Sequence, residues 1–262
     1  MKVSKLLKVV DSIVPLENAF EDDLVGITIG SEESEVNGIL VAHELDRLVL
    51  KHCLSSNINT IISYHPPSFK KILEDDNNES IQPESLTLEF IESSMNVITL
   101  HTAQDVCVGG NADTLAELFD LKNIELFAMT NEKFGAGRIG DIESISITKF
   151  NDFVENKLNT KSIRTNEFFH KIEEINRIAI LPGSGTQFID EILEEVDVYI
   201  TGDISHRYLL KADDARVGLL QIGHISSEIP GMKKFVNKLN NALNEELEYV
   251  YREFYEWTFS TQ

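Results

Sequence analysis

The chain has 262 residues, of which 42% are hydrophobic and 26% are charged. This is the composition of a globular protein that forms one large domain or two small ones. Its 44 acidic residues outnumber its 23 basic residues and give a net charge of −21. Such an acidic surface repels phosphate backbones and anionic lipids, so direct nucleic-acid binding is not expected.

Cysteine usage and hydropathy indicate the compartment. The two cysteines, Cys53 and Cys107, supply no disulfide framework, which is typical of a reducing interior, and we expect Cys107 to be a small buried thiol. Lys8 and Asp11 interrupt the apolar residues near the N-terminus, so this stretch does not predict a signal peptide. No apolar run approaches the ~20 residues needed to cross a bilayer. We therefore expect a cytoplasmic protein without a membrane segment.

The first part of the chain predicts alternating strands and helices. Its apolar spacing predicts, in chain order, a helix over residues 3–13, a strand over 24–30, a strand over 38–42, a helix over 44–55 and a strand over 58–63. The expected inner face of the second helix consists of Leu45, Leu48, Val49 and Cys53. The strand, helix and strand between residues 38 and 63 predict a βαβ unit with parallel pairing.

The next part of the chain begins with a polar stretch over residues 68–81, which predicts a surface excursion. A predicted helix over residues 83–94 then leads to a strand that begins at Val97. The glycine pair 109–110 precedes an amphipathic stretch over residues 113–121. The pair predicts either a cradle for a phosphate or a tight loop into a capped helix.

The second half also predicts α/β structure. The expected elements are a glycine-rich loop over residues 135–142 that runs into a strand, a helix over 149–158, a strand over 178–181, a helix over 188–195, strands over 198–200 and 219–222, a helix over 231–244, and an extended segment with Leu247, Tyr249, Tyr251 and Phe254. Gly183 and Gly185 predict either an anion-binding turn or close packing of a strand against a helix. We expect two lobes, residues 1–128 and 129–262, with the C-terminal segment free to return to the first lobe.

Three apolar runs end in a similar way, each on a histidine. The first ends at His65, the second at His101 with Asp105 four residues later, and the third at His224 with Glu228 four residues later. Ligands gather at the carboxyl ends of strands in open α/β sheets, so we expect these five side chains to form a metal site.

The chemistry of these ligands narrows the choice of metal. Imidazole and carboxylate together suit Zn, Fe, Mn, Co or Ni better than Mg or Ca. Five ligands suit two divalent ions ~3.5–4 Å apart. A single histidine is more often a hydrogen-bonded core or loop residue, and His43, His52 and His170 are therefore left out of the predicted site.

Short motifs in a fixed order carry a family resemblance. They are Tyr64-His65-Pro66-Pro67, His101-Thr102 with Asp105, Gly135 to Gly140, Gly183-x-Gly185, Thr201-Gly202-Asp203 and Gly223-His224 with Glu228. Together they resemble the Nif-three-like family, also called the GTP cyclohydrolase I type 2 homologues. The resemblance implies a two-lobed α/β fold with mixed sheets flanked by helices, a dinuclear metal site between the lobes, and a toroidal homo-hexamer. It also implies that the metal ligands are His65, His101, Asp105, His224 and Glu228.

One residue departs from the family pattern. Many members have a second histidine where this chain has Tyr64, and a neutral phenol is a poor metal ligand. Tyr64 is then expected to hydrogen-bond near the metal or to coordinate as phenolate. Either arrangement leaves one ion more weakly held or with an open position.

The resemblance suggests a hydrolase with a nucleotide or another phosphorylated small molecule as its substrate. His206 is the candidate proton shuttle, and Asp203 is expected to orient His206 or a ligand. Positive charge for phosphate groups is expected from Lys70, Lys71, Arg138 or Arg207, with solvated surface charges as the alternative reading. The alternative function is a non-enzymatic, metal-stabilised oligomeric adaptor or regulatory protein that acts through protein partners.

Overall fold

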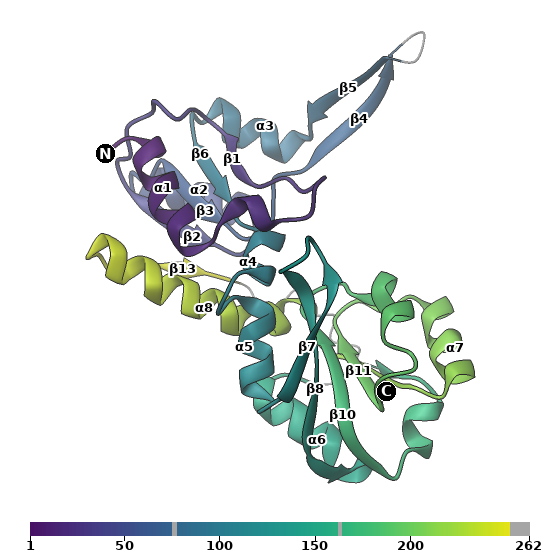
Figure 1. The fold of residues 1–262 in the computed structure, drawn as a ribbon. Coiled ribbons are helices and arrows are strands. Elements are labelled where there is room, and N and C mark those ends of the chain that lie inside the picture. The colour runs from purple at the N-terminus through teal and green to yellow at the C-terminus, as the bar shows by residue number, and fades with distance from the viewer. Residues whose placement is uncertain (75–77, 162–163, 252–262) are drawn as a thin grey trace. The chain divides into compact units, whose positions relative to one another are not determined.

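The computed structural model describes residues 1–74, 78–161 and 164–251 (Figure 1). Within these residues the chain forms two compact units. The first contains residues 1–104 and 235–251, and the second contains residues 105–234. Each has its own sheet, which confirms the predicted α/β class with mixed sheets.

The first unit is built on a five-stranded sheet with the order β1-β6-β3-β2-β13. Its strands are β1 (Gly26–Ile29), β2 (Ile39–Ala42), β3 (Thr60–Ser63), β6 (Asn96–Thr99) and β13 (Tyr249–Val250). Strand β1 is antiparallel to β6, whereas β6, β3, β2 and β13 are parallel. The parallel pairing of β2 with β3 across a helix confirms the predicted βαβ unit. Four parallel strands therefore end at one edge of the sheet.

The helices of the first unit are α1 (Val3–Ile13), α2 (Arg47–Ser55) and α3 (Ser85–Glu92), with a short 3-10 turn η1 (Leu16–Asn18). Helix α2 begins later than predicted, because the Asp46 carboxylate accepts hydrogen bonds from the backbone N–H groups of Leu48 and Val49. Leu48 is 59% exposed, so its predicted place on the inner face of this helix is wrong. Val49 and Cys53 are buried as predicted.

The predicted surface excursion contains two strands that the sequence did not indicate. Strands β4 (Phe69–Glu74) and β5 (Asn78–Pro83) pair in an antiparallel two-stranded sheet. This hairpin extends away from the five-stranded sheet of the first unit (Figure 1). Its polar residues give no clear alternation of apolar and polar positions, so the usual strand signal is missing.

The second unit is built on a six-stranded sheet with the order β7-β8-β10-β11-β12-β9. Its strands are β7 (Lys122–Met129), β8 (Gly135–Ser146), β9 (Arg164–Thr165), β10 (Glu174–Leu181), β11 (Val198–Thr201) and β12 (Gly218–Gln221). Strands β10, β11 and β12 are parallel, and the other pairs are antiparallel.

Helices cover this sheet and complete its core (Figure 1). They are α5 (Asn111–Leu118), α6 (Ile147–Leu158) and α7 (His206–Ala215), with 3-10 segments η3 (Phe168–Lys171) and η4 (Thr186–Glu191). Leu115 of α5 and Phe150 of α6 pack in one cluster with Ile178, Ile200 and Leu220 of the parallel strands. The cluster holds the three central strands in place.

Two further helices connect the units along the chain. Helix α4 (Thr102–Val106) follows β6, and α8 (His224–Leu243) supplies residues to both units. The predicted boundary at residues 128 and 129 differs from the observed division, because α5 packs through Leu115 into the core of the second unit. Residues 235–251 belong to the first unit, where β13 pairs with β2. Of the predicted final segment, Phe254 lies outside the described residues.

Three predictions for the second half are wrong in detail. The glycine-rich residues 135–140 lie inside β8 and not in a loop. Glycine is needed at position 137 because a Cβ there would overlap the ring of Phe127 on the paired strand β7. The predicted helix at residues 188–195 is the six-residue 3-10 segment η4. The last helix begins at His224 and not at Gly231, and it includes Pro230. Within the described ranges, no helix is both long and apolar enough to cross a membrane.

Candidate metal centre

Three histidines lie at the carboxyl edge of the parallel strands in the first unit. His43 follows β2, His65 follows β3 by two residues, and His101 follows β6 by two residues. The strand pairing continues beyond the strands, since the His65 N–H donates to the carbonyl of His43 and the His101 N–H donates to the carbonyl of Tyr64. The ring centroids are 5.2 Å apart for His43 and His65, and 5.7 Å apart for His65 and His101. The topology therefore brings three imidazoles together, as expected for strand ends.

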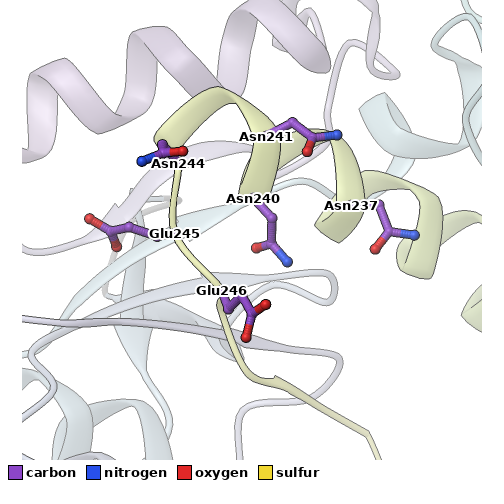
Figure 2. Close-up of a pocket in the computed structure, with 6 residues that line it drawn as sticks. All are labelled: Asn237, Asn240, Asn241, Asn244, Glu245 and Glu246. Atoms are coloured by element: carbon purple, nitrogen blue, oxygen red, sulfur yellow. The ribbon is translucent and has the colours of Figure 1, made fainter.

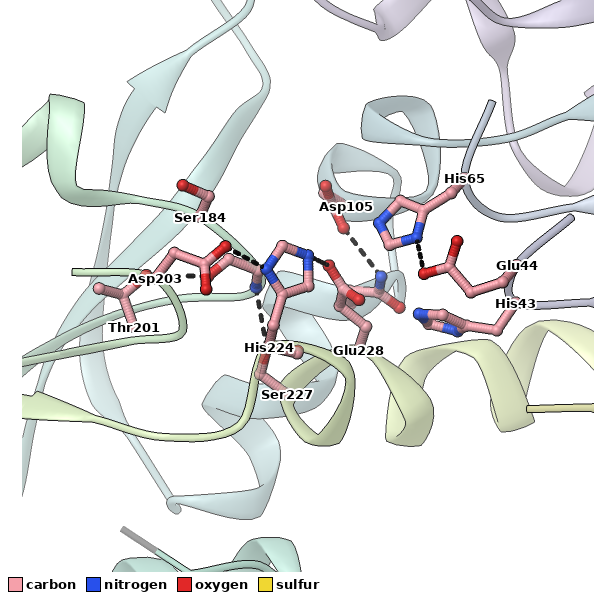
Figure 3. A network of polar contacts seen from close by, with 12 residues as sticks. His43, Glu44, His65, Asp105, Ser184, Thr201, Asp203, His224, Ser227 and Glu228 are labelled. Carbon is pink, nitrogen blue, oxygen red and sulfur yellow. Dashed lines mark hydrogen bonds and ion pairs between the residues drawn. The ribbon is translucent and has the colours of Figure 1, made fainter. Parts of the chain in front are cut away.

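Each of these rings is oriented by a second side chain through its Nδ1 atom. Nδ1 of His65 lies 2.7 Å from Glu44 Oε1 (Figure 3), and Nδ1 of His101 lies 2.5 Å from Asp23 Oδ1. Nδ1 of His43 lies 2.9 Å from the Tyr249 hydroxyl. Metal-binding histidines characteristically donate one ring N–H to such a partner and coordinate through the other nitrogen. The arrangement thus suits coordination through Nε2.

Asp23 is ionised in this arrangement. Burial acts to raise its pKa, but hydrogen bonds from His101 and Thr102 outweigh burial and hold the pKa below its usual range. Its second oxygen accepts hydrogen bonds from the backbone N–H and the hydroxyl of Thr102. His101 has a positive φ of 38°, which turns the chain from β6 into α4. Asp23 and this turn together fix the direction of the His101 ring.

The second unit carries a separate histidine with two carboxylates. His224 and Glu228 occupy successive turns of α8, and His224 Nε2 lies 3.2 Å from Glu228 Oε1. Asp203 Oδ2 lies 2.7 Å from His224 Nδ1 (Figure 3). Burial acts to lower the pKa of His224, but the hydrogen bonds with Asp203 and Glu228 raise it to about 11. The two carboxylates therefore stabilise positive charge at this position. A divalent ion would also supply positive charge there.

A glycine allows the backbone to approach this carboxylate closely. Gly183 has a φ of +64°, and a Cβ there would lie 2.5 Å from Glu228 Oε1. Its N–H donates to the Ser227 hydroxyl, and its carbonyl accepts from the Gly202 N–H. The sequence allowed either an anion-binding turn or close packing of a strand against a helix, and the geometry supports close packing. The helix that packs against Gly183 is α8, on the face that carries Glu228. The following η4 has only six residues, so it offers no α-helical N-terminus for an anion.

Asp105 is buried near the start of the second unit. Its Oδ1 accepts a 2.8 Å hydrogen bond from the Asn111 amide at the start of α5. Asn111 follows the predicted glycine pair, where Gly109 has a φ of +68° and donates its N–H to Asp113. Of the two readings of the glycine pair, these contacts support a tight loop into a helix and not a phosphate cradle. Cys107 is buried, as expected.

The five predicted ligands therefore fall into two groups, each described within its own unit. His65 and His101 belong to the cluster of the first unit, and Asp105, His224 and Glu228 belong to the second. Sequence reasoning missed His43, although Ile39–Ala42 is an apolar strand that ends on a histidine like the others. Ligand atoms of His43 and His65 lie within 4.8 Å of one another, so this pair could hold a metal ion. In the second unit, the carboxylate of Glu228 is a candidate metal ligand.

Other predicted site residues lie in different settings. Arg138 is 4% exposed and donates to Asp113 and to the carbonyls of Gly135 and Gly137, which gives it a structural role in place of the predicted phosphate contact. His206 is exposed at the start of α7, and its role as a proton shuttle stays a prediction.

The remaining candidate cations also lie on the surface. Lys70 and Lys71 are exposed on β4, in agreement with the solvated-charge reading. Arg207 is exposed, and its guanidinium lies 4.6 Å from the centroid of the Tyr208 ring.

A hollow of about 490 Å³ lies in the first unit at the C-terminal end of α8 (Figure 2). Its lining consists of polar side chains from α8 and the residues that follow: Asn237, Asn240, Asn241, Asn244, Glu245 and Glu246. None of the predicted ligands lines it, so it is not part of the candidate metal centre.

The fold and the site define an α/β protein with imidazoles at strand ends, each oriented by an acid or a phenol. Residues 1–256 match the family model Duf34/NIF3 (NGG1p interacting factor 3), and the chain belongs to this family. This confirms the resemblance that the sequence motifs indicated.

Relatives and solved structures agree with this assignment. A protein of Lactococcus lactis named GTP cyclohydrolase 1 type 2 homolog is 31% identical over 230 residues, which cover 86% of each chain. A protein of Clostridium acetobutylicum with the same name is 26% identical over 259 residues, covering 94% of this chain and 92% of the relative. The crystal structure of the Staphylococcus aureus hypothetical protein SA1388 has a TM-score of 0.78 at 26% identity and covers 100% of this chain and 99% of its own.

Proposed function

We propose that this protein is a metal-dependent hydrolase with two divalent ions, held by His65, His101, Asp105, His224 and Glu228. The observation that carries the proposal is the fixing of imidazoles through Nδ1, by Glu44 at His65 and by Asp23 at His101. Side chains prepared in this way bind Zn, Fe, Mn, Co or Ni. The name that relatives carry, GTP cyclohydrolase 1 type 2 homolog, supports the same reaction class.

Ions bound at these residues would act as Lewis acids and make water a nucleophile at neutral pH. The chain itself contributes positioning and proton transfer. Asp203 holds the His224 ring, and Asp23 holds the His101 ring. His206, three residues beyond Asp203 at the exposed start of α7, is the proposed proton donor to the leaving group.

The proposed substrate is a nucleotide or another phosphorylated small molecule. The chain has a net charge of −21, so the cations that attract phosphate groups must be local. Bound divalent ions supply such charge, and Arg207 beside His206 supplies a further cation. We also propose that the protein acts in the cytoplasm as a homo-hexamer, and the buried cysteines Cys53 and Cys107, which are not joined in a disulfide, fit a reducing compartment.

Metal analysis combined with an activity panel tests the proposal. Purified protein and the variants His101→Ala and Glu228→Ala would be analysed by plasma mass spectrometry and assayed against guanosine and adenosine nucleotides. The matched control is His52→Ala, which removes an exposed histidine of α2 that pairs with Glu248. We expect two ions and hydrolysis in the parent and control, and loss of both in the two ligand variants.

The outcomes separate the proposed hydrolase from its alternative. Full metal content in both ligand variants, with folding verified by circular dichroism, would contradict the ligand assignment. Bound metal without hydrolysis of any nucleotide or phosphorylated metabolite would instead support the adaptor or regulatory protein. His206→Gln should keep its metal, slow the reaction and change its pH profile, and an unchanged profile would remove the proton-donor role.

A further inference from the structure

His43 is a fully buried histidine inside the aromatic cluster of the first unit. It has 0% exposure, and its ring centroid lies 4.8 Å from that of Tyr64 and 5.2 Å from that of His65. It follows β2, the parallel neighbour of β3, and Ala42 pairs in register with Ser63. This register places His43 beside Tyr64 and one residue from His65. The position is therefore inside the candidate centre, although the sequence pattern left it out.

We propose that His43 is a metal ligand of this chain and supplies an imidazole beside Tyr64, whose neutral phenol is a poor ligand. The inference rests on the proposed metal centre. It goes further by assigning a sixth side chain and a different strand to the ion nearest His65. Figure 3 shows His43 and Glu44, which follow β2 in the chain, beside His65, which follows β3.

The hydrogen bond at Nδ1 supplies the first argument. Nδ1 of His43 lies 2.9 Å from the hydroxyl of Tyr249, which β13 places beside β2 through the pairing of Tyr249 with Val41. When Nδ1–H donates to the phenol oxygen, the ring is the tautomer whose Nε2 carries the lone pair. Ligating histidines are typically fixed in this way by a group behind the ring. Tyr249 thus orients the His43 ring through Nδ1, in the same way that Glu44 orients the His65 ring.

Distance supplies the second argument. Ligand atoms of His43 and His65 lie within 4.8 Å of one another. Metal–nitrogen bonds of about 2.1 Å allow two ligand nitrogens on one ion to be up to about 4.2 Å apart. The observed upper bound of 4.8 Å is close to this value, so the separation of the two imidazoles suits a shared ion. The two rings meet nearly edge to face, at 86°, so they do not stack flat on each other.

The chemistry of Tyr64 supplies the third argument. This side chain is 1% exposed and lies between His43 and His101, with ring centroids at 4.8 and 6.0 Å. A neutral phenol binds divalent ions poorly, whereas an imidazole from the adjacent strand restores a nitrogen ligand. Nitrogen-rich coordination favours Zn, Ni or Co over Mn. We therefore expect this chain to select one of those three ions at the position nearest His65.

Titration with Co²⁺ tests the assignment. The variants are His43→Gln, His65→Gln as the ligand control and His52→Gln as the non-ligand control, with the metal-free protein of each titrated and its visible absorption recorded. We expect His43→Gln to lose one bound ion or to bind it at least 10-fold more weakly, with a changed cobalt spectrum. Tyr249→Phe should keep the stoichiometry at saturating Co²⁺ and weaken binding about 10-fold, because the ring loses its fixed orientation.

Each result decides a different point. If His43→Gln binds Co²⁺ with parental affinity and spectrum while His65→Gln does not, His43 is a core histidine and the inference is overturned, but the metal centre stands. If the parent binds none of Co²⁺, Zn²⁺, Ni²⁺, Fe²⁺ and Mn²⁺, the proposed function itself fails. Should His43→Gln be unfolded by circular dichroism, Tyr249→Phe decides, and parental affinity in that variant overturns the inference.

Discussion

Gly183→Ala should disturb the second unit at the carboxylate of Glu228. Gly183 has a φ of +64°, and alanine in the left-handed region costs about 1–2 kcal/mol. The new Cβ would also lie 2.5 Å from Glu228 Oε1, against about 3.4 Å for ordinary contact, so the carboxylate must retreat by about 0.9 Å. Overpacking of this kind costs a further ~1–3 kcal/mol. We expect a total loss of about 2–5 kcal/mol in the free energy of unfolding.

Gly26→Ala is the matched control. Gly26 also has a positive φ, +83°, but the nearest atom to a Cβ there is Leu16 Cδ1 at 3.8 Å. In this control, alanine lowers the free energy of unfolding only through its left-handed conformation, by about 1–2 kcal/mol. Urea denaturation followed by circular dichroism measures the loss of unfolding free energy in each of the two variants. Bound metal gives the second measurement, because Glu228 Oε1 is 3.2 Å from His224 Nε2 and its retreat separates two proposed ligands.

The pair of variants gives a clear criterion. The reasoning requires a larger loss of stability in Gly183→Ala than in Gly26→Ala, and a loss of bound metal in Gly183→Ala alone. Equal destabilisation with full metal content in both would refute the close approach of Gly183 to Glu228.

Three other predictions concern the stability of the fold. Asp46→Ala removes the N-terminal cap of α2 and should cost about 1 kcal/mol in urea denaturation, and an unchanged midpoint would contradict the cap. Burial raises the pKa of the Cys53 thiol from 9.0 to about 11, so its contribution to stability is complete below pH 9 and is lost as the pH rises toward 11. Cys53→Ala should flatten the pH dependence of the urea midpoint over that range, and an identical profile would exclude the thiol as its source. Tyr199→Phe removes the buried hydrogen bond to the Gly185 carbonyl and should lower the free energy of unfolding by about 1 kcal/mol, because that carbonyl still accepts from the Phe188 N–H; a loss near zero would contradict the buried bond.

Local signals predicted most of the secondary structure. The apolar spacing of residues 3–13 matches α1, and the short apolar runs match β3, β6, β11 and β12, because buried strands and amphipathic helices leave periodic patterns. The pattern failed where those signals are absent. Strand β5 is polar, β4 has two lysines among its apolar residues, and β7 is mostly exposed, so none of the three is a continuous buried apolar run. Helix α8 includes Pro230, which obscured its true start at His224.

The sequence alone also indicated His65 and His101 as candidates but not His43, because His65 and His101 each follow an apolar strand in the recognised pattern. It could not show what orients them, since Asp23 is 78 residues from His101 in the chain and Tyr249 is 206 residues from His43. Long-range partners of this kind are chosen by the order of strands in the sheet and leave no local pattern. The antiparallel pairing of β1 with β6 brings Asp23 to His101, and the parallel pairing of β2 with β13 brings Tyr249 to His43. The chain order thus determined which residues end strands, and the sheet order decided which of those ends meet.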